Sequence, residues 1–210
     1  MLGADWTTER ERRINVMDRE KVLRHFRDSG ALLEGHFVLS SGLHSPMYLQ
    51  CARVLMSPRR AATLCRALAG KVTATIRRPI DLVVAPAMGG VVVGYEMARQ
   101  LKVPGIFFER VEGKFALRRG FEIPDGANVL MVEDVVTTGL SSRECIEAIK
   151  AEGGRVVGGA CLVDRSGGSA RIGTKLVPLL NMKVPTYEAN KLPKEMRAVP
   201  AVKPGSRGLK

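Results

Sequence analysis

Val129–Ser142 is the segment of this chain whose residue types could do chemistry. Four apolar residues, typical of a buried strand, lead into the adjacent acids Glu133 and Asp134. Ligands bind at the carboxyl ends of strands in open α/β sheets, so an acid pair in this place is well located to meet one. Two further apolar positions are followed by a turn of small residues that contains Thr137, Thr138, Gly139 and Ser141.

The turn leads into an expected helix, and a helix N-terminus with free backbone N–H groups and nearby hydroxyls can cradle a phosphate. Acids beside such a cradle need a partner other than the phosphate. The hydroxyls of a ribose fit, because carboxylates accept hydrogen bonds from them. An acid pair or a Ser/Thr helix cap would each be ordinary alone. Together and in this order they predict a site for a ribose 5-phosphate unit.

Alternating strands and helices are expected to position this site. Short apolar strands are expected at 81–85, 103–108, 128–132 and 155–163, with helices at 91–101 and from about 141 to 151. This alternation predicts an α/β fold with a mostly parallel sheet that is buried on both faces. Residues 109–127 are polar, basic and contain glycines, which indicates a long loop or ribbon.

The residues before this pattern predict a helix, a small β element and a second helix. Asp18 is a candidate N-cap for a helix that ends at Gly30. Residues 35–50 alternate and turn as a small β element would. Ser57 and the following proline open a helix that runs toward Thr75.

The overall composition indicates the class of protein to which this chain belongs. The chain has 210 residues, of which 45% are hydrophobic and 26% charged, as in a soluble globular protein. It contains no apolar run of about 20 residues, so no membrane helix is expected. The four cysteines form no CxxC pair, which fits a reducing cytoplasm. The three histidines are isolated in sequence, and a structural or exposed role is favoured over a metal site.

The net charge of +12 indicates an anionic partner, which could be a nucleic acid, a membrane surface or a phosphorylated small molecule. The basic residues are scattered, and aromatic residues make up only 5% of the chain. Base-stacking recognition of nucleic acid needs aromatic platforms, so no nucleic-acid partner is expected. Because the sequence has no membrane helix and its basic residues are scattered, no membrane partner is expected either.

The Glu133 segment resembles the phosphoribosyl-pyrophosphate (PRPP) motif of type I phosphoribosyltransferases. Phe37–Tyr48 resembles the N-terminal signature of orotate phosphoribosyltransferases, whose Ser-Gly turn and Ser-Pro-x-aromatic run shape the orotate pocket. Pro86–Gly90 lies where that family has its pyrophosphate loop, and the Ala87–Met88 peptide bond is often cis there. Glu109–Lys114 resembles the catalytic loop, and Val163–Arg165 resembles the strand end that holds the orotate carboxylate.

The resemblance implies transfer of the 5-phosphoribosyl group of PRPP to orotate, giving orotidine 5′-monophosphate and pyrophosphate in de novo pyrimidine (UMP) biosynthesis. It implies Mg²⁺ carried by PRPP and no direct metal ligand from the chain. The expected catalytic residues are Arg110, Lys114, Glu133 and Asp134. The same four are expected to bind PRPP, together with Val135, Val136, Thr137, Thr138, Gly139, Leu140 and Ser141. The expected pyrophosphate loop is Ala87, Met88, Gly89 and Gly90, and the expected orotate contacts are Thr137, Arg165 and Tyr48.

The resemblance also implies an organisation and an assembly. Residues 1–16 are expected to be an extension, and 17–210 a single phosphoribosyltransferase domain. Within it, residues 17–50 and the C-terminal segment would form a small hood, and about 51–182 the core. A cytoplasmic homodimer is expected, in which the mobile loop reaches the neighbour's site.

The chain departs from better-known members at four positions. They carry lysines at the positions of Ser40, Gly89 and Val111, and a histidine at that of Ala116. Arg118 and Arg119 are additional cations in the same loop, and they either replace part of the missing contacts or are solvated loop arginines. Three alternatives stay open: a transferase for a purine or uracil, a nucleic-acid-binding regulator that keeps the fold, and a catalytically weakened paralogue.

Overall fold

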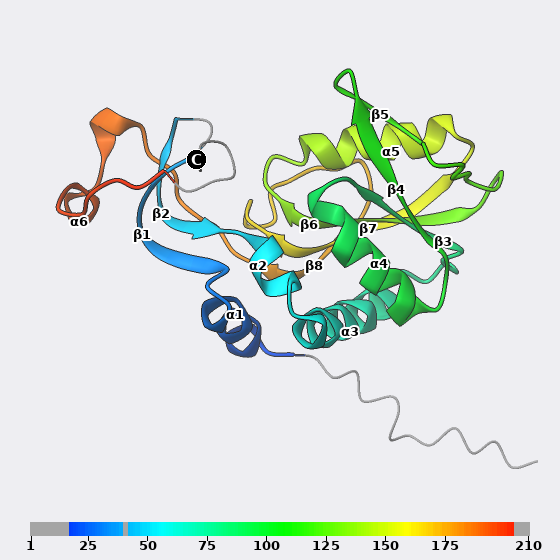
Figure 1. The fold of residues 1–210 in the computed structure, drawn as a ribbon, viewed down its shortest axis with the longest axis horizontal. Coiled ribbons are helices and arrows are strands. Elements are labelled where there is room, and N and C mark those ends of the chain that lie inside the picture. The colour runs from blue at the N-terminus through cyan, green and yellow to red at the C-terminus, as the bar shows by residue number, and fades with distance from the viewer. Residues whose placement is uncertain (1–16, 40–41, 204–210) are drawn as a thin grey trace, which may run out of the picture.

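The protein is described by a computed structural model over residues 17–39 and 42–203 (Figure 1). A six-stranded sheet has the order β5-β4-β3-β6-β7-β8, in which the short edge strand β5 alone runs antiparallel to its neighbour. Its strands are β3 (Leu82–Pro86), β4 (Gly105–Val111), β5 (Lys114–Ala116), β6 (Asn128–Val136), β7 (Arg155–Asp164) and β8 (Leu176–Asn181).

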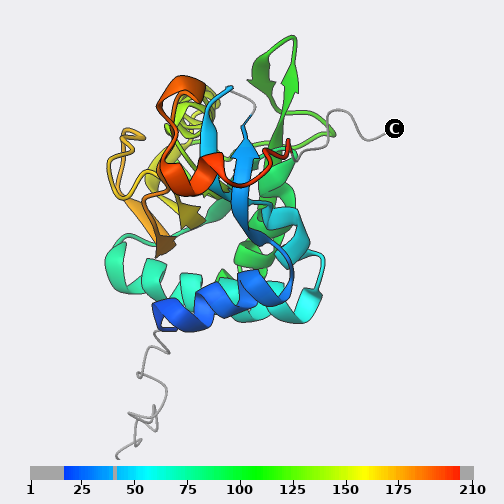
Figure 2. The same ribbon diagram turned by 90° about the vertical axis from the view of Figure 1, so that its left-hand side faces the viewer.

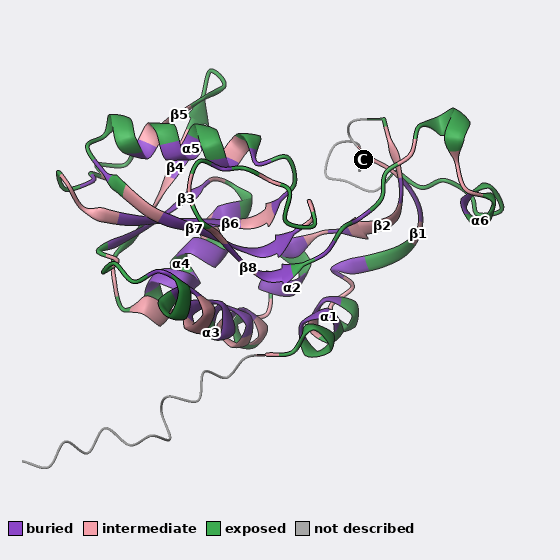
Figure 3. Cartoon of the chain, turned by 180° about the vertical axis from the view of Figure 1, so that it is seen from behind, coloured by how far each residue is buried: buried purple, intermediate pink, exposed green. Residues whose placement is uncertain are grey.

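Helices cover both faces of this sheet, as Figure 1 shows. α3 (Pro58–Thr75) and α4 (Gly89–Leu101) pack on one face, and α5 (Leu140–Ala151) packs on the other. The central strands are buried from both sides (Figure 3), and Val129 to Val132 of β6 have no exposed surface. This burial explains the apolar strand sequences and confirms the predicted α/β fold.

A second, two-stranded sheet lies beside the carboxyl ends of β6 and β7 (Figures 1 and 2). It pairs β1 with β2 antiparallel, and both ends of the described chain surround it. Its neighbours on the N-terminal side are α1 and α2, and on the C-terminal side η1 and α6. The bounds are α1 (Arg19–Asp28), β1 (Leu32–Val38), β2 (His44–Leu49), α2 (Cys51–Leu55), η1 (Ala189–Lys191) and α6 (Lys194–Arg197).

Backbone hydrogen bonds attach the C-terminal segment to this small sheet. Val38 N–H donates to the carbonyl of Val202 over 2.8 Å, and His44 exchanges N–H···O bonds with Tyr187. Each pair joins residues more than 140 positions apart in sequence, one at the outer edge of β1 and the other at the outer edge of β2. The predicted division into hood and core stays a prediction, and the residues 1–16 of the predicted extension lie outside the described part.

Most element predictions are confirmed. Asp18 caps α1 by accepting from Lys21 N–H, and Ser57 caps α3 in the same way through Arg60 N–H. One strand is longer than predicted, since β6 continues to Val136 and the acid pair lies within the strand rather than after it. The predicted loop or ribbon at 109–127 contains the end of β4 and its hairpin with β5. β8 was not predicted.

No helix in the described part of the chain is both long enough and apolar enough to cross a membrane.

Candidate active site

The two acids of β6 point to opposite faces of the sheet. Glu133 is only 6% exposed, and its Oε2 accepts a hydrogen bond from the hydroxyl of Ser142 in the first turn of α5. Asp134 faces the start of α4, where a Cβ on Gly89 would lie 2.9 Å from each of its carboxylate oxygens. The alternation of a strand produces this separation. The acids are adjacent in sequence but have different neighbours.

Both carboxyls are harder to ionise than usual. Burial raises the pKa of Glu133, and hydrogen bonds from Ser142 and Ser141 oppose the rise. Burial also raises the pKa of Asp134, opposed by the backbone N–H groups of Val135 and Asp134. Desolvation disfavours the charged form of an acid, and donors to the carboxylate favour it.

The predicted phosphate cradle is the turn between β6 and α5. Gly139 caps α5 with a φ of 74°, a left-handed conformation that glycine adopts without strain. Thr137, Thr138 and Leu140 are exposed around it, while Val136 is buried beneath. Arg143 braces the turn, since its Nη1 donates to the carbonyls of Thr138 at 3.1 Å and Arg171 at 2.6 Å. The first N–H groups of a helix have no intrahelical partner, and one of those of α5, that of Leu140, donates to Thr138 Oγ1 over 3.3 Å.

The predicted pyrophosphate loop follows β3, the strand next to β6. Its Ala87–Met88 peptide bond is cis, and Ala87 N–H donates to the carbonyl of Phe108 over 2.8 Å. Met88 is 83% exposed, and α4 begins at Gly89. A Cβ on Gly90 would lie 3.1 to 3.3 Å from Pro86, Ala85 and the carbonyl of Val132, so a small residue fits closely here.

Arg165 follows β7, and its N–H donates to the carbonyl of Val136 over 2.8 Å. Its Nε is buried and has no hydrogen-bond partner in the described part of the chain. Burial lowers the pKa of the guanidinium, while Cys51 and Tyr48 interact with it electrostatically in the opposite sense. A buried donor without a partner is costly unless a ligand completes it. The electrostatic influence of Tyr48 on Arg165 puts these two predicted orotate residues in the same region of the molecule.

Arg110 and Lys114 lie on the β4–β5 hairpin, on the α5 side of the sheet. Arg110 Nη2 bonds Glu144 Oε2 of α5 at 2.5 Å, Nη1 donates to the carbonyl of Gly113, and the guanidinium stacks 4.1 Å from the Phe115 ring centroid. Its guanidinium is thus engaged by its own hairpin and helix. Lys114 is exposed. The described structure does not bring either cation to Arg165.

Arg118 and Arg119 both pair with Glu109 of β4. The Arg119 Nε lies 2.6 Å from Glu109 Oε1, and the Arg118 Nη1 lies 3.7 Å from Oε2. Both arginine side chains remain about 60% exposed. In this conformation they brace the segment after the hairpin. Ser40, one of the four departures from the family pattern, lies outside the described residues.

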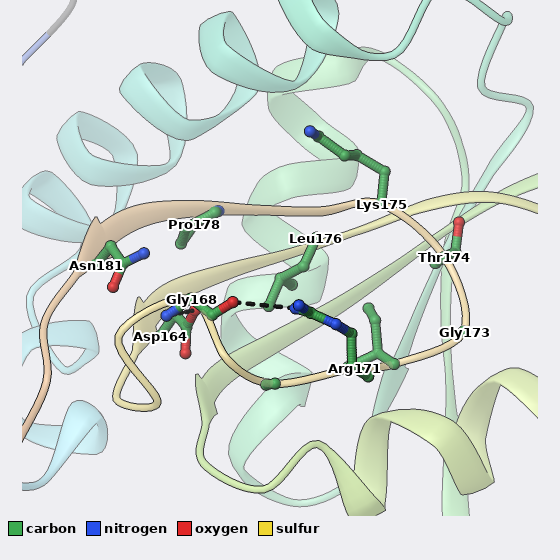
Figure 4. Close-up of a pocket in the computed structure, with 11 residues that line it drawn as sticks. Asp164, Gly168, Arg171, Gly173, Thr174, Lys175, Leu176, Pro178 and Asn181 are labelled. Carbon is green, nitrogen blue, oxygen red and sulfur yellow. Dashed lines mark hydrogen bonds between the residues drawn. The ribbon is translucent and has the colours of Figure 1, made fainter.

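A hollow of about 450 Å³ lies beside β7 and β8 (Figure 4). Two of its charged side chains are paired within the surrounding loop. The Asp164 carboxylate accepts from Ser166 N–H and Oγ and from Gly168 N–H. Arg171 donates to the carbonyl of Gly168. Among its described residues, the hollow has no buried donor without a partner like the Nε of Arg165.

Cysteines and histidines supply no second site. All four cysteines are buried and free, and burial raises the pKa of each thiol, so none is poised as a nucleophile. The histidines are isolated in sequence, but β1 and β2 bring His36 Nε2 to 2.6 Å from His44 Nδ1, a structural contact within the small sheet. In the described part, no three His, Cys, Asp or Glu side chains are grouped to hold a metal.

Sequence reasoning missed Ser142, Glu109 and Glu144. Each acts through a partner on another element, so no local spacing marks it.

Comparison with known proteins places the chain in a family. Residues 57–183 match the model of the phosphoribosyl transferase domain. The orotate phosphoribosyltransferase of Parvibaculum lavamentivorans is 59% identical over 92% of this chain and 100% of its own length. That of Maricaulis maris is 57% identical with the same coverage of both chains.

Solved structures agree. The crystal structure of orotate phosphoribosyltransferase from Aeropyrum pernix aligns with a TM-score of 0.62 at 29% identity, covering 76% of this chain and 93% of that one. The predicted resemblance is confirmed, and the chain belongs to the orotate phosphoribosyltransferases of the type I phosphoribosyltransferase family.

Proposed function

We propose that the chain transfers the 5-phosphoribosyl group of PRPP to orotate, giving orotidine 5′-monophosphate and pyrophosphate in pyrimidine biosynthesis. Family membership supports the activity. The observation that supports orotate as the acceptor is the half-buried guanidinium of Arg165, whose Nε is buried and has no partner in the described structure and which Tyr48 influences electrostatically. A planar fork of N–H donors matches a carboxylate, and orotate differs from uracil by its carboxylate.

The β6–α5 turn holds the phosphoribosyl group in this proposal. The turn from Val135 to Ser141 receives the 5-phosphate on its N–H groups and hydroxyls. Glu133 and Asp134 accept hydrogen bonds from the ribose hydroxyls. Their negative charge also favours the cationic character that the ribosyl centre gains as the C1′–O bond breaks.

The leaving pyrophosphate gathers negative charge and needs cations. When bound to PRPP, Mg²⁺ would neutralise much of this charge, because the ion keeps waters and binds substrate phosphates readily. We assign no side chain of this chain to the ion. Backbone groups of Ala87 to Gly90 contact the pyrophosphate in this proposal. Arg110 and Lys114 approach the pyrophosphate when the hairpin closes.

Orotate lies between Arg165, Tyr48 and Thr137 in this arrangement. Thr137 is exposed at the end of β6, next to the residue that Arg165 contacts through its backbone. Orotate ionises readily, so no general base is required of the chain.

A homodimer with a shared site is supported by one face of α4. Met88, Val92 and Tyr95 follow one another at helical spacing and are 83%, 49% and 71% exposed. Such an apolar stripe is typical of an interface between copies. In the isolated chain, the ion pair between Arg110 and Glu144 keeps the Arg110 guanidinium within its own subunit.

Four free cysteines support a reducing, cytoplasmic location.

Orotate absorbance, followed with purified protein, PRPP and Mg²⁺, tests the function. We expect loss of the orotate signal only when both PRPP and Mg²⁺ are present. Uracil, hypoxanthine and adenine serve as parallel acceptors. Turnover of one of these bases but not of orotate would contradict the proposed acceptor. Binding of PRPP without any turnover would instead favour a regulator or a weakened paralogue.

A further inference from the structure

Ser142 and Glu133 form a contact between the strand and the helix that enclose the cradle. Ser142 has no exposed surface, and its hydroxyl donates to Glu133 Oε2. A carboxylate has two oxygens with about four acceptor sites, so Glu133 can accept from a ligand as well as from its serine donors. Ser142 does not belong to the expected PRPP contacts, which end at Ser141.

Among the ionisable neighbours of Glu133, only Arg110 favours its negative charge. Asp134 on the same strand raises the pKa of Glu133, and burial raises it more. Cys145 of α5 and Cys161 of β7 face it as neutral, buried thiols. Arg110 of the hairpin is the favourable charge, but it also pairs with Glu144 and must move if the hairpin closes. The hydroxyls of Ser142 and Ser141 are the fixed donors on this side.

We propose that Ser142 is a positioning residue for phosphoribosyl transfer, which holds Glu133 ionised and aimed at the ribose while the hairpin cations move. The role at the ribose rests on the proposed function, whereas the Ser142–Glu133 contact does not. Ser142 itself touches no substrate and acts through Glu133.

The first test reads Glu133 without any substrate. Carbon NMR of protein with isotope-labelled glutamate carboxyl groups is recorded against pH, and Glu133→Gln identifies the Glu133 signal. Loss of a donor to the carboxylate favours its protonated form, so we expect Glu133 to titrate at higher pH in Ser142→Ala than in the wild type. Ser29→Ala is the matched control, since Ser29 donates to the carbonyls of His25 and Phe26 at the end of α1. An unchanged midpoint in Ser142→Ala overturns the proposal.

The second test uses the pH profile of turnover. We expect kcat/KM for PRPP in Ser142→Ala to fall about tenfold or more at the acidic end, and to approach the wild-type value at the alkaline end. An equal loss at every pH indicates a merely structural serine and overturns the proposal. Ser142→Cys keeps the size with a weaker donor, so it should shift the profile in the same direction even if the alanine variant folds poorly. A wild type that does not turn over orotate overturns the proposed function, while the NMR midpoint still decides whether Ser142 holds Glu133 ionised.

Discussion

At the residue scale, Arg165 carries the proposed choice of acceptor. Its guanidinium is half-buried, and its Nε is buried with no partner in the described structure. Hydrogen bonds to charged groups contribute about 1.5–3 kcal/mol, so an unused donor is a cost before a ligand arrives. In the proposed function, the orotate carboxylate removes this cost.

Arg165→Lys should therefore raise the KM for orotate by about 10- to 100-fold, because lysine keeps the charge but not the planar fork. The KM for PRPP should change much less. Steady-state kinetics with each substrate varied in turn measures both values. Arg171→Ala, a change in the neighbouring hollow, is the control. Equal increases in both KM values would contradict a specific role at the orotate carboxylate.

Asp134 illustrates a conflict between function and stability. Burial raises the pKa of its carboxyl in the folded state above the unfolded value. The folded state then holds the proton more tightly, so this group makes the protein less stable as the pH rises from the unfolded toward the folded pKa. At neutral pH the charged carboxylate of Asp134 therefore lowers the free energy of unfolding, whereas its proposed role at the ribose needs that charge.

Asp134→Asn should accordingly be inactive and yet more stable than the wild type at neutral pH. A Tm higher by about 2–4 °C corresponds to about 1 kcal/mol in a chain of this size. The gain should shrink in acid, where the wild-type carboxyl is protonated as well. Calorimetry at neutral and acidic pH measures the difference. A Tm below that of the wild type at neutral pH would show that the carboxylate is stabilised rather than penalised.

At the scale of elements, the β4–β5 hairpin determines where Arg110, Arg118 and Arg119 lie. Glu112 and Gly113 both have positive φ, at 49° and 83°, in a two-residue turn between the paired Val111 and Lys114. This geometry suits the twist of a hairpin. Glu109 of the same hairpin then holds Arg118 and Arg119, which places both arginines next to the segment that carries Arg110.

Alanine at both Arg118 and Arg119 should raise the KM for PRPP by about three- to tenfold if they replace part of the missing lysine contacts. Arg77 and Arg78 are an exposed, adjacent arginine pair in the connection between α3 and β3, and their double alanine variant is the matched control. Kinetics at varied PRPP decides. An unchanged KM would leave the two arginines as braces of Glu109.

His36 connects the C-terminal segment to β1 and β2. The ring is 5% exposed, and its Nδ1 lies 2.9 Å from the carbonyl of Val199, while its Nε2 meets His44. His36→Ala should cost about 1–3 kcal/mol of unfolding free energy, because it leaves both partners unsatisfied. His25→Ala on α1 should cost less than about 0.5 kcal/mol. Denaturant unfolding compares them, and equal stability of the two variants would argue against the His36 contacts.

Most elements could be predicted from the sequence because local patterns specify them. Asp18 and Ser57 cap their helices as expected, and the apolar strands are buried on both faces. β8 was missed because Pro178 suggests a break, whereas an edge strand tolerates proline. The acid pair and its turn were predictable from sequence. Ser142, Glu144 and the His36–His44 pair were not, because packing between separate elements creates those contacts.

At the scale of the whole molecule, the described chain does not bring all the proposed site residues together. The acid pair, the cradle and Arg165 gather at the carboxyl ends of β6 and β7, but Arg110 is held by Glu144 on the α5 side. An exposed apolar stripe on α4 offers a surface for a second copy. The proposed dimer would join these observations, with the hairpin of one subunit closing over the site of the other.

Mixed dimers can test this sharing directly. Arg110→Ala and Glu133→Gln proteins, each inactive alone, are mixed in equal amounts under conditions in which subunits exchange. A mixed dimer then has one site with intact Glu133 and an intact partner hairpin, and one site with both defects. Activity should return to about a quarter of the wild-type level, since half of the dimers are mixed and half of their sites are intact. Mass spectrometry of the intact dimers confirms the exchange. If exchange is complete and no activity returns, Arg110 serves the site of its own subunit.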